Sequence, residues 1–394
     1  MARQKKRSDG RYESKIYIGD GKYKCFYAAT QKELEAKVRE YKIKIGKGID
    51  VSTESDTFED WANRWLSRKE KTISNGRYNS YSYRIKGMSE ISKMPISKIK
   101  VSDLQEIIDS KAYSDKPASY KTLKEYKSVM HQIFEYAIVN RVIDFDPSMG
   151  LTLPRTEDDV EERRALTAEE QSWINAPTEH RGHLAAMIMM YSGLRRGELL
   201  ALTWNDININ AKTITVNKSV QMVDHVPKLK NSTKTKAGMR VVSIPTVLAD
   251  YLKEERSKAT TLLVIPNTKG SLMSDYSWKK LWNSYMKELN FKFGNFDDIL
   301  VSDQSGNVKK FKKPNSIKAP VKIPMVIPNI TAHYLRHTYI TMLYMAGVDV
   351  LTASRQAGHS DVKTTMDIYT HLDETYTTKE MNKLDDYIQS KKAT

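Results

Sequence analysis

An arginine and a glutamate stand three residues apart at the start of a helical pattern in the middle of the chain. In YSGLRRGELLALTWNDI, Gly193 interrupts an apolar helix, and Arg195 and Glu198 share one face of the next helix. An arginine held by a carboxylate at a helix start can grip a phosphate, because its planar fork matches two phosphate oxygens. An ordinary ion pair on a helix surface has the same spacing, and for this pair taken alone that plainer interpretation is favoured.

Two histidines and a second arginine gather on another helix. The text TAHYLRHTYITMLYMAG predicts a helix with a threonine cap and a glycine stop. On a helical wheel, His333, Arg336 and His337 fall together on one side. The opposite, buried stripe consists of Leu335, Tyr339, Met342 and Ala346. This pattern predicts an anion site that can donate protons.

A metal site is the main alternative for the two histidines. His333 and His337 are four residues apart, a spacing that zinc ligands on a helix also have. No glutamate follows His333 as it does in metalloprotease helices, and the charge of Arg336 repels a cation. We therefore expect no metal here.

A third segment, RQAGHSDVKTTMDIYTHL, brings a histidine and a tyrosine within ten residues. Gly358 ends one helix, and His359 stands at the junction with the next. Tyr369 follows in that next helix and is a candidate nucleophile. The alternative is that Val362, Met366 and Tyr369 form one apolar helix face, which would make the tyrosine a core residue.

The N-terminal part of the chain, residues 1–50, is basic. It holds 14 lysines and arginines against seven acidic residues. The text RYESKIYIGDGKYKCFY predicts two strands joined by a tight turn at Asp20-Gly21. A helix over 31–45 is available to cover their apolar side, through Leu34, Val38 and Ile45.

Alternation along these two strands predicts which side chains point outward. The expected apolar face holds Ile16, Ile18, Tyr23 and Cys25. The expected DNA-binding face holds Lys15, Tyr17, Lys22 and Lys24. A basic ribbon of this kind fits a DNA major groove, although the solvated edge of a small domain has the same pattern.

The remaining chain divides at an exposed linker. Residues 57–154 read as helices near 57–68, 75–87, 102–111 and 118–139. The segment 152–166 is dense in charges of both signs and contains a proline, which is typical of a linker. Beyond it we expect helices at 167–176 and 182–192, strands at 212–220 and 239–245, and a basic loop or hairpin insertion at 291–325.

Composition narrows the function. The 394 residues carry a formal net charge of +16, which favours a polyanionic partner such as nucleic acid. Cys25 is the single cysteine, so a disulfide within the chain is excluded and a reducing cytoplasm is expected. No apolar run is long enough to span a bilayer, and no phosphate-binding loop for a nucleotide or acidic cluster for paired magnesium ions is evident. We expect no cofactor.

The three segments resemble the signature motifs of the tyrosine recombinase (phage integrase) family, and the chain is similar to integrases of temperate phages and conjugative transposons. The motifs cover residues 166–372. The resemblance implies a catalytic set of Arg195, Lys236, His333, Arg336, His359 and Tyr369, supported by Glu198. Lys236 in KTKAGMR is the best match to the family's lysine on a strand turn, and Lys234 is its alternative. Ala357 replaces the customary leucine of the motif around His359.

The resemblance also implies a protein of several parts. These are a small N-terminal β-ribbon plus helix domain for arm-type DNA sites (1–50), an all-α, SAM-like core-binding domain (57–154) and a mixed α+β, mainly α, catalytic domain (166–372). The C-terminal tail (373–394) has an apolar helix face and is expected to dock on a neighbouring protomer or on its own domain.

The set makes chemical sense for phosphoryl transfer on DNA. Two arginines neutralise the non-bridging oxygens of a phosphodiester, and His333 assists deprotonation of the tyrosine. Lys236 protonates the departing 5′-hydroxyl, and His359 donates a hydrogen bond to the phosphate. The expected product is a 3′-phosphotyrosyl link, formed without metal or ATP, that a second 5′-hydroxyl can attack.

The function expected from this resemblance is integration and excision of a mobile element by a site-specific recombinase. Its expected partners are double-stranded DNA with core and arm sites, a homotetramer on paired sites, an excisionase and a host DNA-bending protein. The alternatives are a catalytically inactive DNA-binding regulator of the same fold, a metal-dependent nuclease using His333, His337 and His359, and a relaxing type IB topoisomerase.

Overall fold

The computed structural model describes residues 6–19, 21–48, 55–155, 164–223, 226–231, 239–302 and 308–369. The chain falls into two compact units that divide between Asp159 and Val160. This division lies inside the linker expected at 152–166. Each unit is described by itself below.

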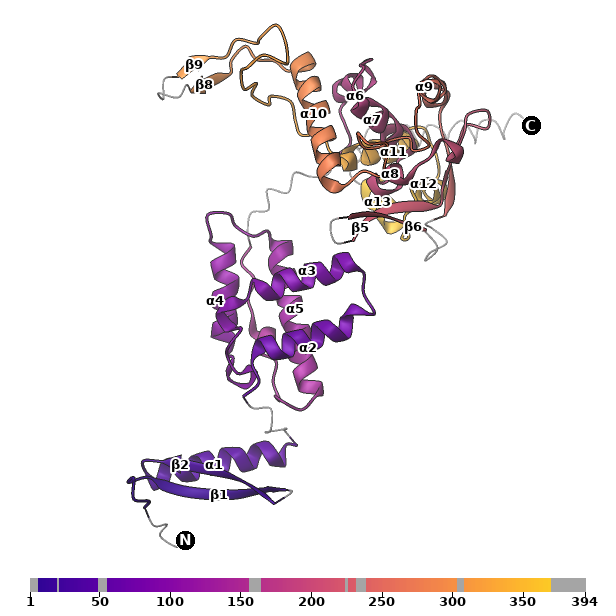
Figure 1. Ribbon diagram of the computed structural model, residues 1–394. Coiled ribbons are helices and arrows are strands. Elements are labelled where there is room, and N and C mark those ends of the chain that lie inside the picture. Colours follow the sequence, from indigo (N-terminus) through magenta and orange to yellow (C-terminus); the bar gives the residue numbers. More distant parts are fainter. Residues whose placement is uncertain are drawn as a thin grey trace, which may run out of the picture. The chain divides into compact units, whose positions relative to one another are not determined.

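The first unit begins with an antiparallel hairpin followed by a helix (Figure 1). Strand β1 (Tyr12–Gly19) pairs with β2 (Lys22–Ala28), and helix α1 (Gln31–Gly46) follows. Gly21 adopts a left-handed conformation with φ of +72°, as the expected turn requires. Both strands and the helix agree with the elements expected from the sequence.

The register of this hairpin contradicts the expected DNA-binding face. Lys15 pairs with Cys25, and Ile16 pairs with Lys24. Residues directly opposite each other in an antiparallel pair share one face of the sheet. The face that holds Lys15 and Tyr17 therefore also holds Cys25, whereas Lys24 shares the other face with Ile16. The alternation of side chains between the two faces was predicted correctly along each strand. Which residues of the two strands share a face depends on the register, which the sequence did not give.

Packing under the hairpin differs from expectation at one more position. Leu34 is buried as expected, but Ile45 is exposed, and Tyr41 is the buried residue near the end of the helix instead. The Tyr41 ring packs against Phe26 with centroids 4.9 Å apart, and the Lys24 ammonium group lies 5.9 Å from the same ring. Lys24 is thus directed to the helix side of the ribbon.

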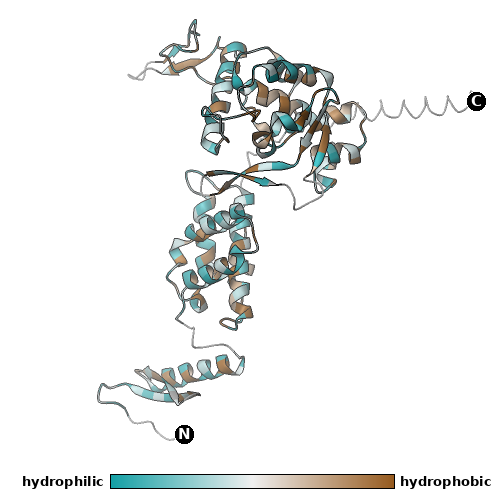
Figure 2. Ribbon diagram, turned by 45° about the vertical axis from the view of Figure 1, so that its right-hand side comes forward, coloured by the Kyte–Doolittle hydropathy of each residue, from teal (hydrophilic) through white to brown (hydrophobic). Residues whose placement is uncertain are grey.

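Among the described residues, four helices and three short 3₁₀ turns make up the rest of the first unit. The helices are α2 (Phe58–Glu70), α3 (Asn75–Lys86), α4 (Val101–Ala112) and α5 (Tyr120–Val139), close to the ranges expected. The 3₁₀ turns are η2 (Ser89–Ile91), η3 (Ile96–Lys98) and η4 (Pro147–Gly150). Apolar and polar residues alternate with helical period, so each helix turns an apolar stripe inward and a polar side outward (Figure 2).

The second unit is mainly helical. In the part of the unit that the structure describes, the helices are α6 (Ala168–Asn175), α7 (Arg181–Ser192), α8 (Arg196–Ala201), α9 (Thr246–Ser257), α10 (Asp275–Phe293), α11 (Ala332–Met345), α12 (Val350–Ala357) and α13 (Lys363–Tyr369). The helices expected at 167–176 and 182–192 are α6 and α7. A 3₁₀ turn, η5 (Trp204–Asp206), follows α8.

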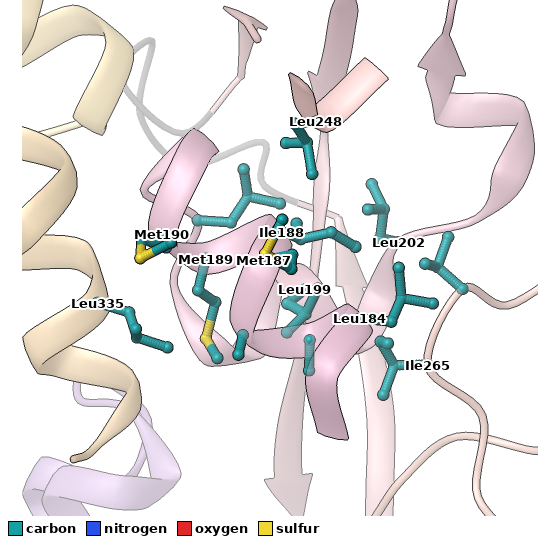
Figure 3. Close-up of a cluster of buried hydrophobic side chains, with 14 of the residues drawn as sticks. Leu184, Met187, Ile188, Met189, Met190, Leu199, Leu202, Leu248, Ile265 and Leu335 are labelled. Atoms are coloured by element: carbon teal, nitrogen blue, oxygen red, sulfur yellow. The ribbon is translucent and has the colours of Figure 1, made fainter. Parts of the chain in front are cut away.

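Helix α7 forms the centre of this unit because it is apolar on nearly all sides. Residues 182–190 are all buried, and Ile188 and Met189 have no exposed surface. Leucines from α8, α9 and α11 pack around it, as Figure 3 shows for Leu199, Leu248 and Leu335. The helix ends at Gly193, whose φ of +62° lets the chain turn directly into the segment that carries Arg195.

Small sheets complete the second unit. Strands β3 (Ile207–Asn208), β4 (Thr213–Val216) and β7 (Arg240–Ser243) form one sheet, and β5 (Lys218–Val223) with β6 (Val226–Asn231) forms a separate hairpin. The single strand expected at 212–220 is therefore two strands in different sheets. Strands β8 (Leu300–Ser302) and β9 (Val308–Lys310) form a hairpin inside the insertion expected at 291–325.

Candidate active site

Arg195 lies at the N-cap position of α8, where the turn at Gly193 places it. Its Nη1 donates to Glu198 Oε1 at 2.9 Å, and its backbone N–H donates to the other carboxylate oxygen at 2.9 Å. Its Nη2 donates to the backbone oxygen of Gly358 at 2.5 Å. The side chain remains 44% exposed, so it keeps surface available for a ligand. The pairing with Glu198 expected from their spacing is confirmed.

A second arginine, Arg240 at the start of β7, forms an ion pair with the same carboxylate. Its Nη1 and Nη2 donate to the two oxygens of Glu198 at 3.1 and 2.8 Å, and its Nε donates to the backbone oxygen of Gln356 at 2.9 Å. Burial by itself raises the pKa of Glu198, but Arg240 and Arg195 outweigh this and lower the pKa to about 2. Glu198 is therefore ionised at neutral pH.

Arg336 is buried, in contrast to the exposed position that the helical wheel predicted. Only 3% of the residue is exposed, and its guanidinium group donates to the backbone oxygens of Gly193 and Ala357. Burial, together with the charges of Arg195 and Arg240, lowers the pKa of Arg336 to about 9, so it stays cationic at neutral pH. The wheel failed because it treats a helix as isolated, while α7 and α12 enclose this face of α11.

The two histidines beside Arg336 lie closer to the surface. His333 is exposed and His337 is half-buried, with their rings 5.4 Å apart in an edge-to-face arrangement. Leu335 and Tyr339 are buried as expected, whereas Ala346 at the end of the predicted stripe is exposed. Among the described residues, no three histidine, cysteine, aspartate or glutamate side chains gather as a candidate metal site.

His359 lies immediately after the left-handed Gly358 that ends α12. Its Nδ1 is 2.8 Å from the hydroxyl oxygen of Thr365, a fully buried residue. Burial, and then the charges of Arg336 and Arg195, lowers the pKa of His359 to about 4. The ring is therefore neutral at pH 7, and the bond at Nδ1 leaves Nε2 for another partner.

Three guanidinium groups lie in this site, and among the described residues one carboxylate, that of Glu198, pairs with two of them. Arg195 and Arg240 contact Glu198, and Arg336 is held by backbone oxygens of the segments next to it. Because one negative charge cannot balance three positive ones, the site retains a positive surplus beside a neutral imidazole. This arrangement attracts an anion and supplies donors for its oxygens, which a phosphodiester requires.

Tyr369 is the last residue of α13, a helix that packs against α11 and α12. The alternative that it belongs to an apolar stripe loses support, because Met366 on the proposed stripe is 51% exposed. Several predicted positions lie outside the described residues: the side chains of Tyr369 and Lys22, the whole of Lys234 and Lys236, and the tail 373–394. Their expected roles stay predictions.

Arg240 and Thr365 were missed by the sequence reasoning. Arg240 follows the expected lysine segment, and its text MRVVS reads as an ordinary strand start. The signal in the sequence that could have indicated Arg240 was Glu198, which lies beside an apolar helix face. A carboxylate buried there needs a second cation. A cavity of about 740 Å³ in the same unit is lined by other residues, including His183 and Tyr251, and by none of the predicted catalytic residues that the structure describes.

Comparison with known proteins agrees with the motifs. The model of the phage integrase family matches residues 156–375, and the model of the phage integrase central domain matches residues 58–152. The chain therefore belongs to the phage integrase family, the class of tyrosine-type site-specific DNA recombinases.

Particular relatives share most of the chain. A protein named tyrosine recombinase XerC-like from Caldanaerobacter subterraneus subsp. tengcongensis is 30% identical over 370 residues, covering 89% of this chain and 88% of the relative. The transposase of transposon Tn916 from Enterococcus faecalis is 24% identical over 393 residues, covering 93% of this chain and 90% of the relative. These names support an integrase and recombinase, and they give no support to a regulator or a metal-dependent nuclease.

Solved structures share the fold. The Tn1549 transposon integrase in complex with a circular intermediate DNA aligns with a TM-score of 0.64 at 18% identity, covering 83% of this chain and 99% of that one. A lambda integrase dimer bound to a core site aligns with a TM-score of 0.53 at 17% identity, covering 92% and 93%. Within the described residues of this chain, every helix is too short or too polar to span a lipid bilayer.

Proposed function

We propose that this recombinase cuts and rejoins the DNA of a mobile element through a 3′-phosphotyrosyl bond to Tyr369. The observation that carries the proposal is the surplus of positive charge around Glu198, where three arginines lie near a neutral His359. Tyr369 is the last described residue of the same unit. A phosphodiester and a tyrosine nucleophile are the reactants that suit such a site.

In the proposed step, the phenol oxygen of Tyr369 attacks phosphorus and the bond from phosphorus to the 5′ oxygen breaks. His333 receives the phenol proton, and Lys236 gives a proton to the departing 5′ oxygen. Arg195 and Arg336 neutralise the non-bridging oxygens, while His359 donates from Nε2. Attack by the 5′-hydroxyl of a second strand reverses the same chemistry, so no ATP or metal is consumed.

Each arginine has its own task in this proposal. Arg195 keeps exposed surface and is suited to direct contact with the phosphate. Arg336 is buried, and its bonds to two backbone oxygens fix its plane, so it acts on the phosphate from a preorganised position. Arg240 is a positioning residue, because its side chain is 8% exposed and three of its five N–H donors are bonded to Glu198 and Gln356.

The proposed partners follow from the same reading. Double-stranded DNA is the substrate, with a core site for the catalytic unit and arm sites for the N-terminal ribbon. The structural relatives include a lambda integrase tetramer bound to a Holliday junction, and we propose a tetramer on paired sites for this chain as well. An excisionase and a host DNA-bending protein complete the proposed assembly.

The decisive experiment is covalent trapping on a nicked suicide duplex that carries the junction of the element, with EDTA present. The wild-type protein is expected to form a DNA adduct that survives a denaturing gel, because release of the short 5′ strand makes cleavage irreversible. Tyr369→Phe is expected to bind the duplex and form none, since it lacks the attacking oxygen. An adduct that persists in Tyr369→Phe moves the nucleophile to Tyr376 or another tyrosine. Bound DNA without any wild-type adduct would favour an inactive regulator.

A further inference from the structure

The insertion between α10 and α11 carries an unusual concentration of lysine. Its segment VKKFKKPNSIKAPVK, residues 308–322, contains six lysines and no acidic residue. Its hairpin, β8–β9, projects from the end of α10 away from the other helices of its unit (Figure 1). None of the residues proposed for catalysis lies in it, so its charge calls for a separate explanation.

Two of the six lysines have partners in the insertion or at the end of α10. The Lys313 ammonium group lies 5.0 Å from the ring centroid of Phe291 and 5.4 Å from that of Phe296. Lys310 lies 3.8 Å from a carboxylate oxygen of Asp298, and both side chains are largely exposed. Lys313 therefore fixes the base of the hairpin, whereas the ion pair of Lys310 is weak.

The other four lysines are exposed, and they have no ion pair or ring contact among the described residues. They are Lys309, Lys312, Lys318 and Lys322. Four cations on one short segment, none with an ion pair among the described residues, repel one another unless an anion binds there. Such a group lowers its electrostatic energy by binding a polyanion.

The base of the insertion is rigidly attached to the catalytic unit. Phe311 is buried against Phe296, with ring centroids 5.4 Å apart. Asn290 of α10 is almost fully buried and holds the returning chain, donating to the Pro324 oxygen at 2.9 Å and accepting from the Val326 N–H at 2.8 Å. The lysines are thus presented on a fixed base, which reduces the entropy lost on binding.

We propose that this insertion is an additional, sequence-independent contact to the DNA backbone, made by Lys309, Lys312, Lys318 and Lys322. The inference rests on the proposed function in that DNA is the polyanion brought to this unit. A lysine is a point charge that suits phosphate oxygens without reading a base. Lys309 lies on β9 of a two-stranded ribbon, an element whose width a DNA groove admits, and the other three lysines follow this strand in the chain.

The test replaces all four lysines by glutamine and measures DNA affinity of the full chain against salt concentration. A phosphate contact contributes about 0.9 to the slope of log K against log salt, so the variant's slope should be shallower by up to about 3.6. The same reduction is expected on the core-site duplex and on an unrelated duplex of equal length, because backbone contacts carry no sequence information.

A matched control removes the same charge elsewhere in the unit. Lys253, Lys269, Lys280 and Lys287 are also exposed, and changing these four to glutamine should leave most of the wild-type slope. An equal loss of slope in both variants would reduce the effect to net charge and overturn the proposal. An unchanged slope with impaired assembly of protomers would also overturn it, and would make the insertion a protein interface.

Failure of this inference is distinguishable from failure of the proposed function. The covalent adduct on the suicide duplex at low salt reports the chemistry, and the four-lysine variant should still form it because the catalytic residues are untouched. The salt slope reports binding alone and is readable whether or not an adduct forms. Circular dichroism and thermal unfolding of each variant verify that the fold is retained.

Discussion

At the scale of single residues, Glu198 organises the site through two arginines that come from different elements. Arg195 precedes the helix of Glu198, while Arg240 reaches it from a strand more than 40 positions further along the chain. Arg240 also bonds the backbone at Gln356, two residues before the glycine that positions His359. A change at Arg240 should therefore disturb both the arginine and the histidine of the site.

We expect Arg240→Gln to lower the free energy of unfolding by about 3 kcal/mol, since it breaks a buried ion pair. The rate of DNA strand cleavage should fall at least about tenfold, because Glu198 no longer holds Arg195 in a fixed position. Arg240→Lys should recover little, as an ammonium group cannot replace the bidentate fork. The measurements are urea unfolding and the rate of adduct formation.

Arg196→Gln is the matched control for this change. Arg196 neighbours the site in sequence but pairs with Asp275 in a half-exposed ion pair, worth less than about 1 kcal/mol. Equal effects of the two substitutions, or an Arg240→Gln protein with wild-type cleavage, would show that Arg240 has no positioning role.

The neutral state of His359 makes stability depend on pH. Its pKa is about 4 in the folded protein against an ordinary value of 6.5, so between these values the unfolded chain binds a proton that the folded chain does not. The free energy of unfolding should then decrease as the pH falls from 6.5 toward 4. His359→Gln removes this loss of stability on acidification, which is about 1 to 3 kcal/mol.

The check is urea unfolding of wild type and His359→Gln at pH 7, 5.5 and 4.5. Other titrating groups are common to both proteins, so the difference between their profiles isolates His359. The wild type should lose more stability on acidification than the variant does. Parallel profiles would mean that His359 titrates normally in the folded state.

At the scale of elements, short helices and left-handed glycines bring the predicted catalytic groups together. Gly193 ends α7 and Gly358 ends α12, with φ of +62° and +67°. The backbone oxygens freed at these two ends accept from Arg336 and Arg195. The helix ends thus serve as ligands for guanidinium groups, which explains why a buried arginine is tolerated here.

Gly358→Ala should impair catalysis more than stability alone would explain. A Cβ at this position would lie 2.7 Å from Arg240 Nη1, so the guanidinium group must move. Gly270→Ala is the control, since Gly270 has φ of +78° but its Cβ would meet only the Thr261 methyl at 3.3 Å. Both changes should cost about 1 to 2 kcal/mol of backbone strain, and only Gly358→Ala should slow adduct formation per folded molecule. Equal rates would refute the coupling through Arg240.

At the scale of the whole molecule, each of the two units has its own large hydrophobic core among the described residues. One core contains Leu104 and the other contains Leu199, and these cores share no residue. We expect calorimetry to resolve two unfolding transitions. Leu104→Ala and Leu199→Ala should each lower a different transition, at a cost of about 2 to 5 kcal/mol per substitution. A single transition that both substitutions shift equally would show that the units unfold as one.

The sequence by itself determined many of the helices and the motifs that indicate the class of this protein. The helices predicted at 57–68 and 118–139 lie close to α2 and α5, because helical periodicity is a signal that acts within a few residues. In the structure, Thr57 and Ser119 cap these two helices. The three motifs also carry their chemistry in local text, and the family comparisons confirm the class of protein that they indicate.

Only the tertiary structure decided which faces these residues present and which partners they have. Strand alternation leaves register open, so Lys24 was assigned to the wrong face of the ribbon. A helical wheel cannot show that α12 covers Arg336, and no local pattern links Arg240 to Glu198. The physical reason is the same in each case. A buried charge is stable only when distant segments supply its hydrogen bonds, and those segments meet only in the folded chain.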